Sequence, residues 1–219
     1  MAEEDTTGPE ELRPERTALL VVDMTNEFVA EAGRFGISGA REMIPRLNRT
    51  IRESRDQGTP VVFLREVNRP GGHDAGVKAR LSPGTPGRDV HAPGWQTELH
   101  DDVDFDPEVD IDIVKRQYSG FHGTELDDVL RGLNVERVVI TGVASQICCN
   151  ATAEDAFYHG YRVLVLSDCT AAARIRDQGW GEFSAETVQR FWLSRMATYF
   201  GDVTDASGYC EALSASATR

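Results

Sequence analysis

The sequence lacks any apolar run long enough to cross a membrane. A transmembrane helix needs about 20 mainly apolar residues, and no stretch of this 219-residue chain approaches that. Residues 1–16 are acidic and polar, without the basic and apolar regions of a signal peptide. We therefore expect a cytoplasmic protein that does not enter a membrane.

Basic residues are scarce. The chain has 23 Lys and Arg against 36 Asp and Glu, which gives a formal net charge of −13. Binding to nucleic acid or to an anionic membrane requires clustered Lys and Arg, so both partners are disfavoured. The acidity itself is typical of a solubilising surface, and a small molecule remains the expected partner.

Cysteine is too rare for a disulfide framework. Of the four cysteines, Cys148 and Cys149 are adjacent and cannot easily pair. No CxxC motif or Cys/His cluster suggests structural zinc. We therefore expect the protein to reside in a reducing compartment. Cys149, Cys169 and Cys210 are expected to be structural.

Short apolar runs alternate with helical patterns. We expect strands at 17–23, 60–64, 111–114, 137–141, 162–167 and 202–204, and helices at 40–57, 125–133 and 186–200. This alternation predicts a three-layer, doubly wound α/β sandwich: a mostly parallel six-stranded sheet, in the common order 3-2-1-4-5-6, with helices on both faces. We assign one domain to residues 17–214 and expect residues 1–16 to be disordered.

Cys148 is the most informative residue. It follows a predicted strand and a turn at Gly142, in the first turn of a predicted helix. Unpaired N–H groups and the helix dipole there favour the thiolate, which is the nucleophilic form. Cys148 is therefore a candidate nucleophile.

Asp23 and Lys115 are its candidate partners, because each ends a predicted buried strand. A partly desolvated Asp23 suits general-base work, and an ammonium at Lys115 would lower the pKa of the thiol. In the assumed order the third strand lies two strands from the first, roughly 10 Å away. The long side chain of Lys115 would have to bridge that gap.

Three segments carry a resemblance: Asp23-Met-Thr-Asn-Glu-Phe, Lys115-Arg-Gln-Tyr-Ser-Gly-Phe and Gly142-Val-Ala-Ser-Gln-Ile-Cys148. In this order they resemble the signature segments of the isochorismatase-like cysteine hydrolases, in particular the N-carbamoylsarcosine and ureidoacrylate amidohydrolases. The resemblance implies a triad of Asp23, Lys115 and Cys148, no cofactor, and a homo-oligomer (dimer or tetramer). It also implies a cis peptide between Val143 and Ala144, with the N–H groups of Ala144 and Cys148 forming an oxyanion hole.

Two departures narrow the subfamily. True isochorismatases lack the nucleophilic cysteine, so Cys148 argues against that chemistry. Nicotinamidases carry an Asp-x-His metal site after the second strand, where this chain has Glu66, His73 and Asp74 at a different spacing. These three residues are alternatives for a metal site, but a polar substrate-access loop is favoured and we assign no metal.

Other residues are weaker candidates. Arg174 or Arg176 could hold a substrate carboxylate, although solvated arginines are the simpler reading. His91, His100, His122 and His159 have no catalytic context. Residues in the motif segments or the long loop that are expected to line the substrate pocket are Asn26, Phe28, Asn68, Trp95, Tyr118 and Phe121, with core packing an equal alternative for Trp95 and Phe121.

The function predicted from these patterns is hydrolysis of a C–N bond in a small amide, carbamoyl or ureido compound through a thioester on Cys148. One alternative is a nicotinamidase-type amidase. Another, from a different class, is a redox sensor that uses Cys148 without hydrolase activity.

Overall fold

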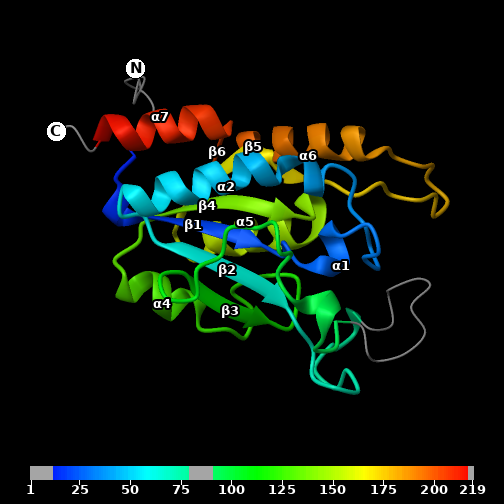
Figure 1. Ribbon diagram of the computed structural model, residues 1–219. Helices are drawn as coiled ribbons and strands as arrows, with labels where there is room; N and C mark the ends of the chain where they lie inside the picture. The colour runs from blue at the N-terminus through cyan, green and yellow to red at the C-terminus, as the bar shows by residue number, and fades with distance from the viewer. Residues whose placement is uncertain (1–11, 79–90, 217–219) are drawn as a thin grey trace.

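A six-stranded parallel sheet forms the centre of the computed structural model, which describes residues 12–78 and 91–216 (Figure 1). The strands are β1 (Thr17–Val22), β2 (Val61–Glu66), β3 (Ile111–Lys115), β4 (Arg137–Val143), β5 (Arg162–Ala171) and β6 (Asp202–Thr204). Their order is β3-β2-β1-β4-β5-β6, and every neighbouring pair is parallel. The predicted sheet and its order are confirmed.

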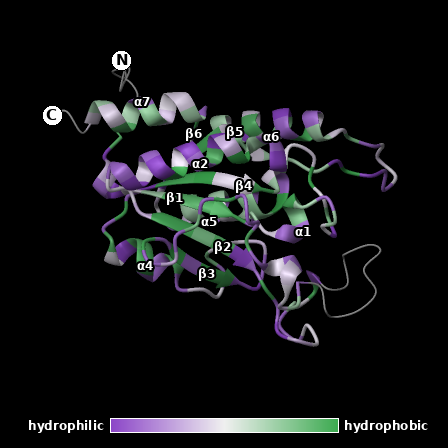
Figure 2. Cartoon of the chain, in the orientation of Figure 1, coloured by the Kyte–Doolittle hydropathy of each residue, from purple (hydrophilic) through white to green (hydrophobic). Residues whose placement is uncertain are grey.

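Helices cover both faces of this sheet. α2 (Ala40–Asp56) and α7 (Ala206–Ser216) pack on one face, and α4 (Leu126–Gly132), α5 (Asn150–Tyr158) and α6 (Ala185–Tyr199) contribute to the core on the other. The strands are coloured as mainly hydrophobic in Figure 2, as expected for strands buried on both faces.

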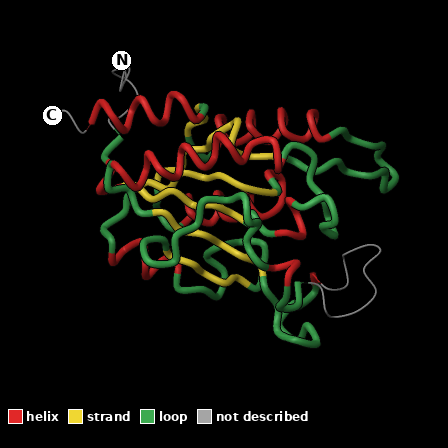
Figure 3. The backbone as a smooth tube through the Cα atoms, in the orientation of Figure 1, coloured by secondary structure: helices red, strands yellow, loops and turns green. Residues whose placement is uncertain are grey.

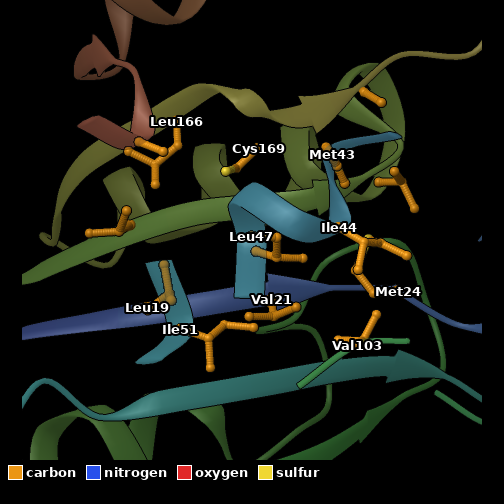
Figure 4. Packing of buried hydrophobic residues seen from close by; sticks show 14 of the residues in the cluster. Leu19, Val21, Met24, Met43, Ile44, Leu47, Ile51, Val103, Leu166 and Cys169 are labelled. Carbon is orange, nitrogen blue, oxygen red and sulfur yellow. The ribbon is translucent and has the colours of Figure 1, made fainter. Parts of the chain in front are cut away.

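The α2 face shows how the sequence pattern builds the core. Met43, Ile44, Leu47 and Ile51 recur at helical spacing and are all buried. Figure 4 shows them packed over strand residues such as Val21. This packing anchors α2 across the middle of the sheet.

Some elements were not expected. Among them are α1 (Asn26–Val29), α7 and a 3-10 turn, η1 (Pro14–Arg16), which follows the buried Leu12. Residues 12–16 of the segment expected to be disordered are therefore ordered, and residues 1–11 lie outside the described residues. Within the described ranges, no helix is long and apolar enough to span a membrane.

The carboxyl ends of the strands carry the long connections (Figures 1 and 3). α1, residues 67–78, the short turn η2 (Trp95–Thr97) and the β5–α6 connection all lie at this end. At the same end Gly142 has a φ of 98°, and a Cβ there would lie 2.0 Å from the carbonyl oxygen of Val22. Only glycine permits this close approach of β4 to β1.

Candidate active site

Cys148 lies where β4 passes into α5. The connection is a π-helical turn, η3 (Ser145–Cys149), and the thiol is buried. The Val143–Ala144 peptide is cis, as the resemblance implied. The Ala144 carbonyl accepts hydrogen bonds from the N–H groups of Ile147 and Cys149, at 3.0 and 3.2 Å. Cys148 therefore sits in a short, hydrogen-bonded turn at the carboxyl end of β4.

Asp23 directly follows β1 and is fully buried, with a left-handed φ of 49°. This conformation is tolerated better by Asp than by most residues. One carboxylate oxygen, Oδ1, accepts a hydrogen bond of 2.8 Å from the backbone N–H of Glu66. The other, Oδ2, lies 2.8 Å from Nζ of Lys115. Both oxygens of the expected base are therefore held by contacts from the ends of β2 and β3.

Lys115 closes the gap that strand order alone left open. It ends β3, and its side chain is fully buried. Its ammonium extends past the end of β2 to reach Asp23, and it also lies 3.3 Å from Oε2 of Glu66. A third contact, of 3.2 Å, is to the carbonyl oxygen of Gln117. The ammonium thus lies between two buried carboxylates.

The sulfur of Cys148 joins this group. A carboxylate oxygen of Asp23, one of Glu66 and Sγ of Cys148 all lie within 4.8 Å of one another. Sγ is 3.7 Å from Oε2 of Glu66. The three residues predicted as a triad are therefore brought together from three strand ends, with Glu66 beside them.

The alternative metal set of Glu66, His73 and Asp74 is not assembled. Glu66 lies at the centre of the buried site, whereas His73 is exposed. Asp74 accepts a hydrogen bond from the backbone of Arg69 and lies 3.4 Å from Nε of Arg116. Glu66 belongs to the site because it ends β2, next to Asp23, which follows β1, and Lys115, which ends β3.

The charges of the site follow from burial and from these contacts. Burial raises the pKa of Asp23, and Lys115 only partly opposes it. Burial also acts to raise the pKa of Glu66, but the charges of Lys115, His91 and Lys78 outweigh it and leave that pKa at about 2. Burial acts to lower the pKa of Lys115, yet its anionic neighbours hold it well above its usual value. The resting site thus contains an ammonium, an ionised Glu66 and a more basic Asp23.

The thiol behaves differently from the prediction. Burial raises the pKa of Cys148 well above its ordinary value, and although Lys115 opposes this, Asp23 and Glu66 add to it. Lys115 does act to lower the pKa of the thiol, as predicted, but burial and the two carboxylates outweigh it, so the expected net fall in that pKa does not occur. The thiol holds its proton until a base removes it.

Comparison with known proteins agrees with this arrangement. A family model described as "Isochorismatase domain" matches residues 17–207. The chain belongs to the isochorismatase domain family. The ureidoacrylate amidohydrolase RutB of Cronobacter sakazakii is 31% identical over 229 aligned residues, which cover 95% of this chain and 94% of that protein.

Two solved hydrolase structures are also similar to this chain. A cysteine hydrolase from Pseudomonas syringae pv. phaseolicola has a TM-score of 0.90 at 30% identity, covering 94% of this chain and 96% of its own. The N-carbamoylsarcosine amidase of Thermoplasma acidophilum has a TM-score of 0.68 at 28% identity, covering 87% and 96%. The family resemblance carried by the three motifs is confirmed.

Within this isochorismatase-family fold, three of the expected pocket residues belong to the segments around α1. Asn26 is buried and donates a hydrogen bond of 2.9 Å to the carbonyl oxygen of Trp95, whose own side chain is about half exposed. Phe28 is buried and stacks on Phe35 at 5.5 Å between ring centroids. Asn26 therefore holds the two segments together, and Trp95 presents its ring at the surface.

Asn68 and Tyr118 lie nearer the charged group. Asn68 is fully buried and donates to the carbonyl oxygen of Arg116 at 3.2 Å. Tyr118 is partly exposed, with its ring centroid 5.7 Å from Nζ of Lys78, and the charges of Glu66 and Cys148 contribute, after burial, to raising its pKa. Tyr118 is thus a partly exposed side chain on which the charged groups of the site act.

For Phe121 and for the two arginines, the structure agrees with the alternatives of core packing and solvent exposure. Phe121 is buried in the core, stacked on His159 at 4.9 Å and close to Tyr161 at 5.8 Å, beyond the far end of α5. Arg174 is exposed and lies 3.7 Å from Glu182, and Arg176 is also exposed. Packing explains Phe121, and solvent contact explains the arginines.

His91 is a neighbour of the buried site that the sequence did not reveal. It is buried, with Nε2 3.3 Å from Oε1 of Glu66 and Nδ1 2.7 Å from Oε1 of Glu27. His91 lies 25 positions after Glu66 in the chain, so no local spacing connects them. His91, which was expected to have no catalytic context, therefore lies in contact with a residue of the buried site.

Proposed function

We propose that the protein is an amidohydrolase that cleaves a non-peptide C–N bond of a small amide, carbamoyl or ureido compound through a thioester on Cys148. The observation that carries this proposal is the ion pair of Asp23 and Lys115, at 2.8 Å, beside the sulfur of Cys148. A base, a cation and a thiol in one buried cluster are the groups that nucleophilic acyl transfer requires.

Asp23 acts as the general base. Of the two carboxylates near the sulfur, Asp23 has the raised pKa and Glu66 the lowered one, so Asp23 is the better proton acceptor. Lys115 is the fixed positive charge that keeps Asp23 ionised and offsets the negative charge of the developing thiolate.

The first half of the reaction forms the thioester. Asp23 takes the proton from Cys148 as the sulfur attacks the carbonyl carbon, and the carbonyl electron pair moves onto oxygen. The backbone N–H groups of Ala144 and Cys148 bind this oxyanion. When the oxygen electron pair returns, the C–N bond breaks, and Asp23 gives its proton to the leaving nitrogen.

The second half releases the product. Asp23 takes a proton from water, and the resulting hydroxide attacks the thioester carbonyl carbon. The C–S bond then breaks, and the departing sulfur recovers its proton from Asp23. The sum is one water consumed for each C–N bond cleaved, with all side chains restored.

The substrate class is supported by two relatives. One is named as a ureidoacrylate amidohydrolase and the other as an N-carbamoylsarcosine amidase. Their names favour a ureido or carbamoyl group over a simple aromatic amide such as nicotinamide. We also propose a homo-oligomer, dimer or tetramer, which light scattering would test.

The experiment is ammonia release from a panel of small amides and ureides, with and without a chelator. Cys148→Ala should abolish turnover of any active compound, because no nucleophile remains. Cys149→Ala is the matched control: its buried thiol is directed at the carbonyl oxygen of Thr141, 3.8 Å away, and it should retain activity. Unchanged turnover in Cys148→Ala would refute the proposal.

The redox alternative is not favoured by the environment of the thiol. Oxidation by peroxide requires a thiolate that solvent can reach. Cys148 is buried and its pKa is raised by that burial. Reversible sulfenylation together with an absence of any amidase activity would favour the sensor instead.

A further inference from the structure

The carboxylate of Glu66 is the most heavily contacted group in the site, yet the proposed mechanism assigns it no step. Its side chain is only 1% exposed. Oε1 forms an ion pair with Lys78 and lies 3.3 Å from Nε2 of His91. Oε2 lies 3.3 Å from Nζ of Lys115 and 3.7 Å from Sγ of Cys148.

The outer contacts of Glu66 are themselves held in place. Lys78 is buried and donates a second hydrogen bond, of 2.7 Å, to the carbonyl oxygen of Arg116. His91 is fixed on its other side by Glu27 of α1, which is fully buried. The position of Glu66 is thus set from β2, from α1 and from the segment between β2 and β3.

We propose that Glu66 is a fourth residue of the catalytic centre, whose fixed negative charge keeps the proton on Cys148 until substrate arrives. This inference rests on the proposed thioester mechanism and deepens it. Lys78 and His91 act as positioning residues, because they contact Oε1 of Glu66, whose Oε2 lies 3.7 Å from the sulfur.

The reaction supplies the reason for such a group. The leaving nitrogen needs a proton, and in the resting site that proton resides on Cys148. If the thiol lost its proton to solvent beforehand, an ionised Asp23 would have none to deliver when the C–N bond breaks. A buried anion next to the sulfur disfavours that premature loss.

Charged groups from several elements act on the thiol, either directly or through Glu66. Asp23 after β1 and Glu66 at the end of β2 disfavour the thiolate, whereas Lys115 at the end of β3 favours it. Lys78 and His91 act on Glu66, and Glu27 acts on His91. Tyr118 lies at the accessible side of the cluster.

The test is Glu66→Gln, which removes the charge and preserves the shape. The rate of alkylation of Cys148 by iodoacetamide, measured by peptide mass at several pH values, should rise about tenfold or more at pH 7, which corresponds to a fall of about one unit in the pKa of the thiol. The value of kcat/KM should fall, and its basic limb should move to lower pH.

Three further variants separate charge from folding. Glu66→Asp keeps the charge and should return the alkylation rate at pH 7 toward that of the wild type. Glu27→Gln makes the same chemical change in the cluster, but His91 lies between Glu27 and Glu66, so the effect on the thiol should be smaller. Lys78→Met leaves Glu66 less compensated and should slow alkylation, the opposite direction.

The results that would overturn the inference are equally specific. With circular dichroism like that of the wild type, an unchanged or slower alkylation in Glu66→Gln contradicts it, as does an equal acceleration in Glu66→Asp. If Glu66→Gln fails to fold, faster alkylation in a folded Lys78→Met variant contradicts it. Alkylation does not require turnover, so this outcome is independent of whether Cys148→Ala abolishes hydrolysis.

Discussion

Replacing Lys115 with Met should strongly destabilise the fold as well as abolish activity. The methionine side chain has a similar length but carries no charge. It would leave Asp23 and Glu66 facing each other, both buried, without the ammonium that now lies 2.8 and 3.3 Å from their oxygens. Uncompensated buried charge is among the most destabilising changes a single substitution makes.

The size of the effect follows from these distances. Two unit charges 2.8 Å apart attract by about 6 kcal/mol at an effective dielectric constant of 20, a gross value from which the desolvation of the ammonium must be subtracted. Removing one partner of a buried pair typically lowers the free energy of unfolding by about 3–5 kcal/mol. We expect Lys115→Met to fall in that range at pH 7.

The assay is urea unfolding followed by circular dichroism, on Lys115→Met, Asp23→Asn and the double variant. The double variant should be more stable than Lys115→Met, because one of the two uncompensated charges is gone. Without Lys115 the folded-state pKa of Asp23 rises further above its unfolded value. Lys115→Met should therefore lose less stability, compared with the wild type, at pH 5 than at pH 7. The stability that comes from a raised pKa is lost as the pH rises through that pKa. A loss below about 1 kcal/mol, the value typical of an exposed pair, would refute the reasoning.

Three other predictions test separate parts of the account. The acid limb of kcat/KM should have its midpoint above 3.8, because the base Asp23 must be ionised and burial raises its pKa; a midpoint below that value would point to Glu66 as the base. Gly142→Ala should lower the free energy of unfolding by about 3 kcal/mol, because the residue has a positive φ and an added Cβ would clash with Val22. Gly132→Ala in α4 should be neutral or stabilising, because an added Cβ there would meet no atom outside its own helix and chain neighbours within 4 Å. Equal effects of the two substitutions would contradict this prediction. Phe121→Ala should lower the free energy of unfolding by about 3–5 kcal/mol without changing KM. Tyr118→Ala should change KM and leave the free energy of unfolding nearly unchanged. Steady-state kinetics and thermal unfolding would show both results.

Most of the fold could be predicted because local patterns and the sheet topology agree. The apolar runs at 17–23 and 137–141 match buried central strands, and the common doubly wound order brings their carboxyl ends together. Asp23, Lys115 and Cys148 were therefore recognisable as strand-end residues before any distance was known. Short elements such as α1 gave no periodic signal, because four residues make barely one helical turn.

The electrostatics of the site could not be predicted, because they depend on burial and on contacts distant in sequence. Cys148 was expected to ionise easily, but the depth of its burial and the proximity of Glu66 reverse that expectation. Glu66 was considered only beside its sequence neighbours His73 and Asp74. One of its actual partners, His91, lies 25 positions further along the chain.

The central claim, a covalent intermediate on Cys148, is tested most directly by intact-protein mass spectrometry during turnover of an active amide or ureide. Samples quenched with acid in the steady state should show a mass increase equal to the acyl or carbamoyl group, and peptide mapping should locate it on Cys148. Cys149→Ala should give the same adduct, and Cys148→Ala should give none. Turnover without any adduct in the wild type, together with retained activity in Cys148→Ala, would contradict the account.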